Sequence, residues 1–118
     1  MARIFNLRRK STLALRQRKD RLLELLELSP DLIRASFVER YSRCGKPLCS
    51  CRQGRQKHGP FYYLTQCLGV GHINKFLLRT PAQQQAAKQA IEHYGQFQAQ
   101  LEELSQINTE LLRREEPL

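Results

Sequence analysis

No apolar run in this 118-residue chain approaches the ~18 residues that a membrane-spanning helix needs, so we expect no membrane insertion. The basic start of the chain is not followed by an apolar stretch, which argues against a secretory signal and for a cytoplasmic location. Hydrophobic residues make up 41%, enough for a small core of about one domain. Four cysteines in that compartment are predicted to be thiols, metal ligands or redox groups rather than structural disulfides.

Motifs of catalysis are also missing. The sequence has no Cys-x-x-Cys pair, no phosphate-cradling glycine motif and no Ser-His-Asp arrangement, and its three histidines are scattered. A lone histidine in a helical segment, such as His93, is usually only exposed. We therefore predict that the protein is not an enzyme.

Acidic residues are few and unevenly placed. The chain has 20 lysines and arginines against 11 acidic residues, a formal charge of +9. Residues 1–21 hold eight basic side chains and one acid, and residues 40–57 hold six bases and no acid, whereas residues 80–118 hold three bases and six acids. This distribution favours a polyanionic partner for the first two regions, although a basic face can also serve solubility alone.

Residues 1–28 are predicted to form a basic arm and a helix. Ser11 or Thr12 can cap the helix, and leucines from Leu15 to Leu26 recur along one side. Ser29-Pro30 should end it, because proline cannot donate to a continuing helix.

Residues 29–79 change to a β pattern. Strands are expected over 36–41, 61–65 and 73–78, with 44–60 as a loop and Gly69-Val70-Gly71 as a hairpin turn. The predicted class is α+β: a small three-stranded antiparallel sheet with a cysteine-rich loop, flanked by an N-terminal helix and a long C-terminal amphipathic helix.

Residues 80–118 are predicted to form that long helix. Thr80-Pro81-Ala82-Gln83 is typical of a capping box with proline in the first turn. Steps of three and four then give a coiled-coil pattern through Ala87, Ala90, Tyr94, Phe97, Leu101, Leu104, Asn108 and Leu111.

This pattern leaves two packing partners open. The helix can pack on the leucine stripe of residues 15–26 in the same chain, or on a second copy through residues 87–111. Asn108 at an a-type position favours a dimer, since a buried asparagine there fixes register in two-stranded coils. The alternative is that Asn108 faces water near a frayed end.

The cysteines indicate a metal site. Cys44, Cys49, Cys51 and His58 lie in the acid-free region, and thiolate and imidazole are the ligands that structural zinc prefers. Zinc would order a loop that has little apolar content of its own. Cys67 competes with His58 as fourth ligand and His72 is a weaker candidate. Metal-free thiols and a redox switch are the alternatives.

The motif Arg43-Cys44-Gly45-Lys46-Pro47-Leu48-Cys49-Ser50-Cys51, followed by His58-Gly59-Pro60-Phe61-Tyr62-Tyr63-Leu64, resembles a family of small uncharacterised bacterial proteins. The resemblance covers about residues 35–115. It implies a loop, a strand, a basic hairpin and a long C-terminal helix, and members are often encoded near mobile elements. This chain departs from the pattern in its hairpin, where only Lys75 and Arg79 follow Gly71. The resemblance supplies no activity.

The favoured function is nucleic-acid binding, with DNA favoured over RNA, in an accessory of a mobile element or a larger nucleoprotein complex. Basic side chains would contact phosphates, and one of two neighbouring tyrosines would stack on a base. The predicted contact residues are Arg8, Arg9, Lys10, Arg40, Arg43, Lys46, Arg52, Arg55, Lys57, Tyr62 and Lys75. The alternative is an assembly subunit that docks a larger protein through its C-terminal helix.

Overall fold

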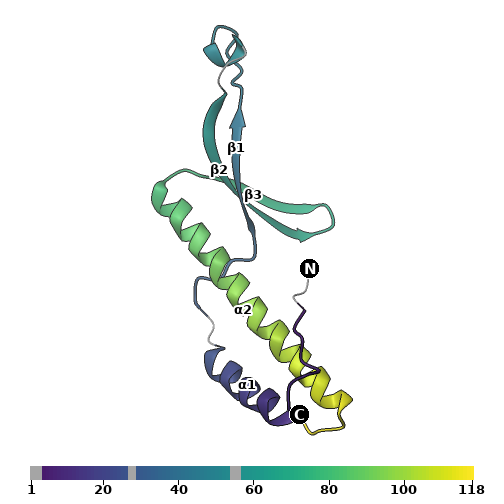
Figure 1. Cartoon of the computed structure of the whole chain (residues 1–118). Coiled ribbons are helices and arrows are strands. Elements are labelled where there is room, and N and C mark those ends of the chain that lie inside the picture. Colours follow the sequence, from purple (N-terminus) through teal and green to yellow (C-terminus); the bar gives the residue numbers. More distant parts are fainter. Residues whose placement is uncertain (1–3, 27–28, 54–56) are drawn as a thin grey trace. The chain divides into compact units, whose positions relative to one another are not determined.

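The computed structural model describes residues 4–26, 29–53 and 57–118 (Figure 1). The elements follow the order α1 (Thr12–Leu25), β1 (Ser36–Ser42), η1 (Ser50–Gln53), β2 (His58–Gly69), β3 (His72–Leu78) and α2 (Pro81–Arg113). The chain divides into two compact units. Unit 1 comprises Met1–Leu32 and His93–Leu118, and unit 2 comprises Ile33–Glu92. The predicted α+β class is confirmed, and neither helix of the described residues could cross a membrane.

Unit 2 contains the predicted three-stranded antiparallel sheet, in the order β1-β2-β3. Both turn glycines have positive φ, 150° at Gly69 and 74° at Gly71, which explains the tight hairpin. The prediction that residues 44–60 are all loop is wrong at its end, because β2 begins at His58. A register shift between Arg40 and Ser42 lets β1 accommodate Gly59-Pro60, which would otherwise interrupt the ladder.

The sheet has two different faces, because paired residues on neighbouring strands point to the same side. The helix face carries Phe37, Tyr62, Leu64 and Leu78, and Ala87 of α2 packs against it. The open face carries the alternate positions, which include Val38, Tyr63 and Leu77 opposite one another. None of the core members found among the described residues of unit 2 belongs to the open face.

The core of unit 1 is the intrachain helix pair. Leu15 and Leu22 of α1 and Ile107 and Leu111 of α2 are fully buried together, with Leu7 of the N-terminal segment. Ser11 caps α1 by accepting a 3.1 Å hydrogen bond from the Ala14 amide. The first of the two predicted packing arrangements is therefore present.

The predicted spacing of α2 is only partly reproduced. Leu104 and Leu111 pack in unit 1 as expected, and the capping box forms between Thr80 and Gln83. However, Ile107, which the predicted series omits, is fully buried, while Leu101 is 44% exposed. Both residues belong to unit 1, where α1 and Leu7 pack on the side of α2 that carries Leu104, Ile107 and Leu111.

Replacing Leu22 with alanine should destabilise unit 1 by about 2–5 kcal/mol, because the fully buried side chain leaves a cavity. The matched control is Leu13→Ala on the same helix, whose side chain is 67% exposed and should cost less than about 1 kcal/mol. Urea unfolding followed by circular dichroism measures both. Equal losses in the two variants would contradict the assigned core.

Candidate metal centre and basic surface

The segment between β1 and β2 brings four metal-binding side chains together. The ligand atoms of Cys44, Cys49, Cys51 and His58 all lie within 4.8 Å of one another. Cys44 Sγ is 3.4 Å from Cys51 Sγ, and Cys49 Sγ is 3.1 Å from His58 Nε2. A tetrahedral zinc ion with bonds of about 2.3 Å to sulfur keeps its sulfur ligands about 3.8 Å apart, so the four atoms are close enough to hold a metal ion.

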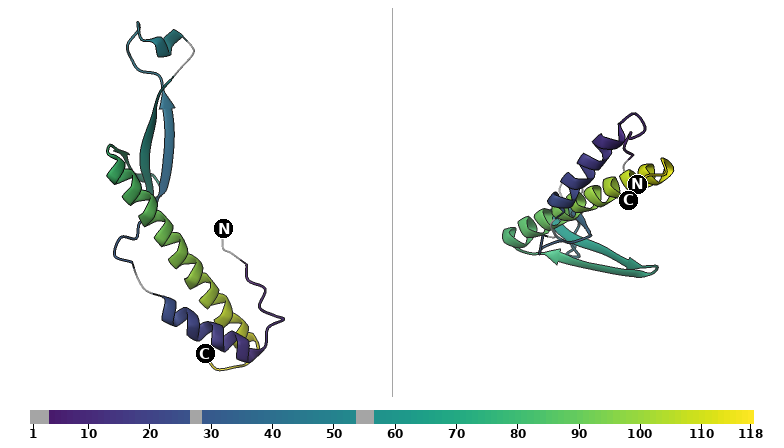
Figure 2. Two further views of the ribbon diagram at one scale, coloured as in Figure 1. Left: turned by 60° about the vertical axis from the view of Figure 1, so that its left-hand side comes forward. Right: turned by 90° about the horizontal axis from the view of Figure 1, so that it is seen from below.

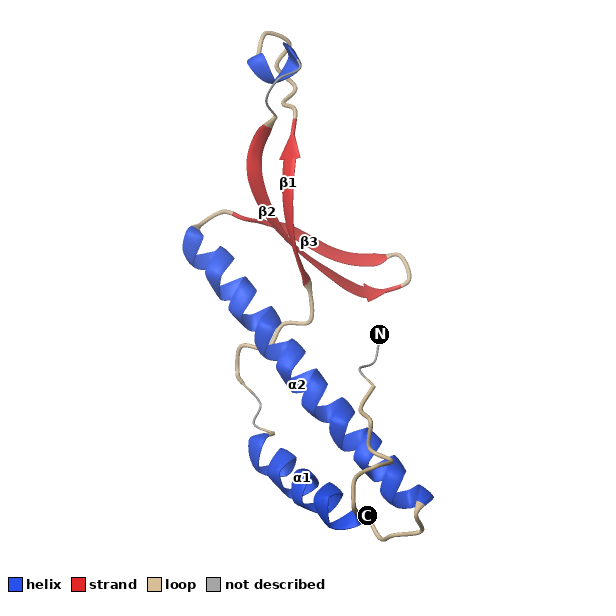
Figure 3. Cartoon of the chain, viewed as in Figure 1, coloured by secondary structure: helices blue, strands red, loops and turns tan. Residues whose placement is uncertain are grey.

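Backbone structure explains this convergence. Ser42 pairs with His58, so the β1–β2 ladder brings the two ends of the segment together (Figure 2). Pro47 occupies the first central position of a turn closed by the Cys49 amide, which donates to the Lys46 carbonyl at 3.2 Å. The short helix η1 then carries Cys51 back towards Cys44, whose amide donates to Cys51 Sγ at 3.3 Å (Figure 3).

Gly59 lets β2 approach β1 beside the cluster. Its φ is 138°, and a Cβ atom there would lie 2.9 Å from both the Arg40 carbonyl oxygen and a Tyr41 ring carbon. Any larger side chain would push the strands apart next to His58. The glycine of the His-Gly-Pro motif thus has a steric role in positioning one of the four ligands.

Sulfur, rather than hydrocarbon, occupies the interior of this segment. Cys51 is 1% exposed, whereas Leu48, an aliphatic residue of the same segment, is 93% exposed. Cys44 and Cys49 are half-buried. Hydrophobic burial therefore does not order residues 43–51, whereas a metal ion held by the four clustered ligand atoms could do so.

The electrostatics of the cluster favour a thiolate. The pKa of Cys49 falls to about 6, chiefly because the Cys51 amide donates to its sulfur, with help from the Cys44 thiol and the His58 ring. For Cys44, the Lys46 amide lowers the pKa, but the Cys51 thiol, burial and the charge on Cys49 together raise it. A thiolate at Cys49 beside three further donor atoms is a suitable starting state for binding a cation.

The competing ligands do not join the cluster. Cys67 is exposed in β2 and its Sγ lies 3.6 Å from the Gly69 carbonyl oxygen, and His72 is exposed at the start of β3. Neither belongs to the group of metal-binding side chains found among the described residues. Of the three candidates for the fourth ligand, the structure thus places only His58 with the three cysteines.

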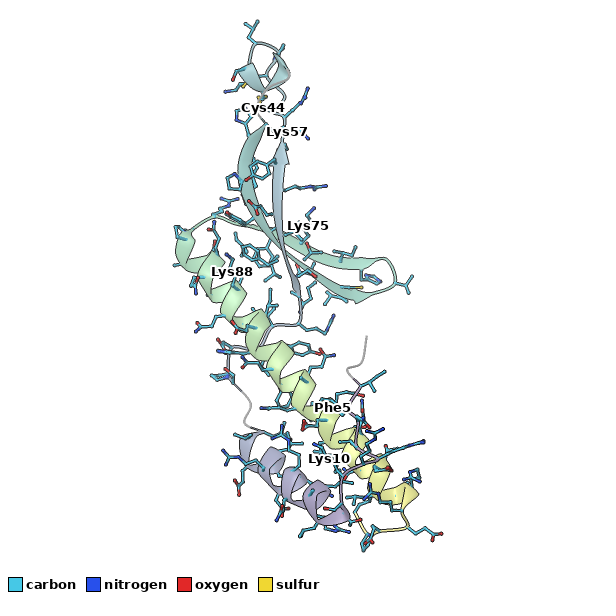
Figure 4. All side chains as sticks on the ribbon, viewed as in Figure 1. Phe5, Lys10, Cys44, Lys57, Lys75 and Lys88 are labelled. Carbon is cyan, nitrogen blue, oxygen red and sulfur yellow. The ribbon has the colours of Figure 1, made fainter. Side chains whose placement is uncertain are left out.

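Cationic side chains surround the cluster. Arg40, Arg43, Lys46 and Lys57 are exposed, and no ion pair in the described part of the chain engages them. Figure 4 shows Lys57 and Cys44 at the same end of the β1–β2 pair. Arg55 lies outside the described residues, as does the side chain of Arg52.

In unit 1, by contrast, arginines of α1 form ion pairs. Arg18 Nε donates to Glu103 at 2.6 Å, and Arg16 pairs with Glu116 at 3.5 Å, so acids of the C-terminal region neutralise α1. The backbone of the basic arm is held by Arg114, which donates to the Lys10 carbonyl at 2.8 Å. The side chains of Arg8, Arg9 and Lys10 remain exposed.

The two neighbouring tyrosines lie on opposite sides of the sheet. Tyr62, the predicted nucleic-acid contact, packs on the helix face, with its ring centroid 5.2 Å from that of Phe37. Tyr63 lies on the open face, where Lys75 Nζ is 5.0 Å from its ring centroid. The packing therefore favours Tyr63 over Tyr62 for contact with a ligand. Strand alternation predicted one tyrosine on each side, but only the register identifies which one is open.

Comparison with known proteins adds one match. A protein family described as a domain of unknown function (DUF6788) matches residues 13–67, which include all of α1 except its first residue, all of β1 and all four residues of the metal cluster. The match supports the expected similarity to an uncharacterised family; the bacterial origin and the mobile-element context stay predictions. No curated protein and no solved structure matches the chain.

Proposed function

We propose that the protein is a zinc-stabilised nucleic-acid-binding module, with DNA as the favoured partner. Zinc is the proposed ion because it is borderline-soft and structural zinc sites commonly combine three thiolates with one imidazole. A zinc ion with three thiolates and a neutral histidine carries a net charge of −1. The exposed cations of the adjacent segment balance that charge and leave a surplus.

The proposal rests on one observation: the metal cluster is flanked by cations whose charge no acidic side chain of the described residues neutralises. Arg43, Lys46 and Lys57 flank the ligands and have no carboxylate partner among the described residues, whereas Arg16 and Arg18 of α1 do. If the cations served only solubility, we would expect no difference between the two sets in their pairing with carboxylates. Cations held free on an ordered segment suit the phosphate backbone of a nucleic acid.

A salt titration tests this function. A fluorescently labelled DNA should bind at low salt, and the logarithm of the association constant should fall linearly with the logarithm of salt concentration, by about 0.9 per phosphate contact. Absence of binding at low salt, or an affinity independent of salt, would overturn the proposal.

A second candidate function, self-assembly through α2, is favoured by Asn108. Its Oδ1 is buried without a hydrogen-bond partner in the described part of the chain, beside a pocket lined by Leu101, Leu104 and Leu112. Leu101 and Leu112 are 44% and 64% exposed. A second copy of α2 would cover these leucines and allow the two asparagine amides to pair with each other.

Replacing Leu101 and Leu112 with glutamate should therefore convert a dimer into a monomer, because the charges would be buried in the interface. Sedimentation velocity over a range of concentrations measures the change. Leu13→Glu, at an exposed position of α1, is the control and should leave the dimer intact. A wild-type protein that stays monomeric at the highest concentration would rule out this assembly.

A further inference from the structure

The open face of the sheet combines aromatic, aliphatic and cationic side chains. Tyr63 lies at its centre, with Val38 opposite on β1 and Leu77 opposite on β3. One step towards the metal segment, Phe61 pairs with Arg40, and one step the other way, Thr65 pairs with Lys75. Phe61, Tyr63 and Thr65 are half-buried, although no core cluster covers them among the described residues of unit 2.

The face is free of negative charge. The described positions of the open face include the exposed cations Arg40 and Lys75, and they contain no aspartate or glutamate. The acid of β1, Glu39, lies at an alternate position on the helix face, opposite Tyr62. The charge of this surface therefore complements an anionic ligand.

Rings and cations are interleaved at the spacing of the strands. Lys75 Nζ lies 5.0 Å from the Tyr63 centroid, and Arg40 is opposite Phe61. Residues that alternate along a strand are about 7 Å apart, which is close to the distance between successive nucleotides of an extended strand. A duplex hides the faces of its bases, whereas an unpaired strand can present each base to a ring and each phosphate to a cation.

We infer that the open face binds unpaired nucleotides, with the Tyr63 ring stacking on a base and Arg40 and Lys75 contacting the adjoining phosphates. This inference rests on the proposed nucleic-acid binding and narrows its substrate class to single-stranded nucleic acid. Phe61 supplies a second stacking position beside the cations of the metal segment. Together, the open face and the cations of the metal segment form one continuous contact surface for the nucleic acid within unit 2.

The test compares short labelled oligonucleotides in fluorescence anisotropy at one salt concentration: single-stranded DNA, single-stranded RNA and the DNA duplex. Single strands should bind the wild-type protein about tenfold or more tightly than the duplex. Tyr63→Leu, which keeps an apolar strand residue, should weaken single-strand binding about tenfold, and Tyr63→Phe should retain it. Tyr41→Leu is the matched control, because Tyr41 is 52% exposed in the same unit but donates to Glu39.

The outcomes distinguish a failure of the single-strand inference from a failure of the proposed nucleic-acid binding. Equal or tighter duplex binding by the wild-type protein would overturn the single-strand assignment and leave nucleic-acid binding standing. Single-strand binding by Tyr63→Leu as tight as that of the wild type would likewise overturn the inference and leave nucleic-acid binding standing. Absence of binding to all three oligonucleotides would instead remove the proposed function. The wild-type comparison decides the matter even if Tyr63→Leu fails to fold.

Discussion

Replacing Cys49 with serine is expected to remove the metal and to unfold residues 43–53. The wild-type protein should contain about one zinc per chain, and the variant close to none, because a structural site with three ligands holds zinc far more weakly than one with four. Coordination contributes about 10–16 kcal/mol of apparent binding free energy in small zinc domains, and no apolar burial compensates for its loss here. Elemental analysis measures the metal.

Hydrogen exchange shows the structural consequence of the same change. The amides of Cys44 and Cys49 donate to Cys51 Sγ and to the Lys46 carbonyl, so both should lose protection when the metal leaves. Cys67→Ser is the matched control, since this exposed cysteine lies outside the cluster and should change neither the metal content nor the exchange. A native protein without metal whose segment is still protected would contradict the assignment.

Neutralising the cations around the cluster should have the second large effect. The variant with glutamine at Arg40, Arg43, Lys46 and Lys57 removes four exposed charges. If each contacts a phosphate, the slope of the salt dependence should fall by about 0.7–0.9 per residue, and the affinity at 0.1 M salt should drop on the order of a hundredfold.

The control variant removes the same charge from α1. Arg16, Arg18, Lys19 and Arg21 already bond to carboxylate or carbonyl oxygens, so replacing them with glutamine should lower affinity only a few-fold through the net charge. Exposed ion pairs of this kind contribute about 1 kcal/mol or less, so α1 should remain folded. Equal losses in the two variants would show that overall charge, and not the metal segment, determines binding.

Local signals in the sequence predicted the parts of the fold that depend on local chemistry. Ser11 and the Thr80–Gln83 capping box start the two helices because their side chains satisfy free amides of the first turn. The three strands follow from their β-branched and aromatic residues, and the turn between β2 and β3 follows from glycines that adopt positive φ. The cysteines and His58 were predicted as ligands because structural zinc prefers thiolate and imidazole and because their loop has little apolar content of its own.

Features that depend on tertiary packing were not predicted. Ile107 is fully buried outside the expected series because Leu15 and Leu22 of α1 pack against that side of α2, and a helical period alone does not reveal which side they cover. The open position of Tyr63 and the covered position of Tyr62 depend on the register of β2, which periodicity leaves undetermined. The steric role of Gly59 depends on a contact with β1 that only the fold creates.

The most direct test of the account measures nucleic-acid affinity with and without the metal. Protein stripped by a chelator should bind single-stranded DNA at least about tenfold more weakly than the zinc-loaded protein at the same salt concentration, because its cations lose their fixed positions. Restoring about one equivalent of zinc should restore the affinity. Equal affinity in the two forms would contradict the claim that a metal-ordered basic segment forms the binding surface.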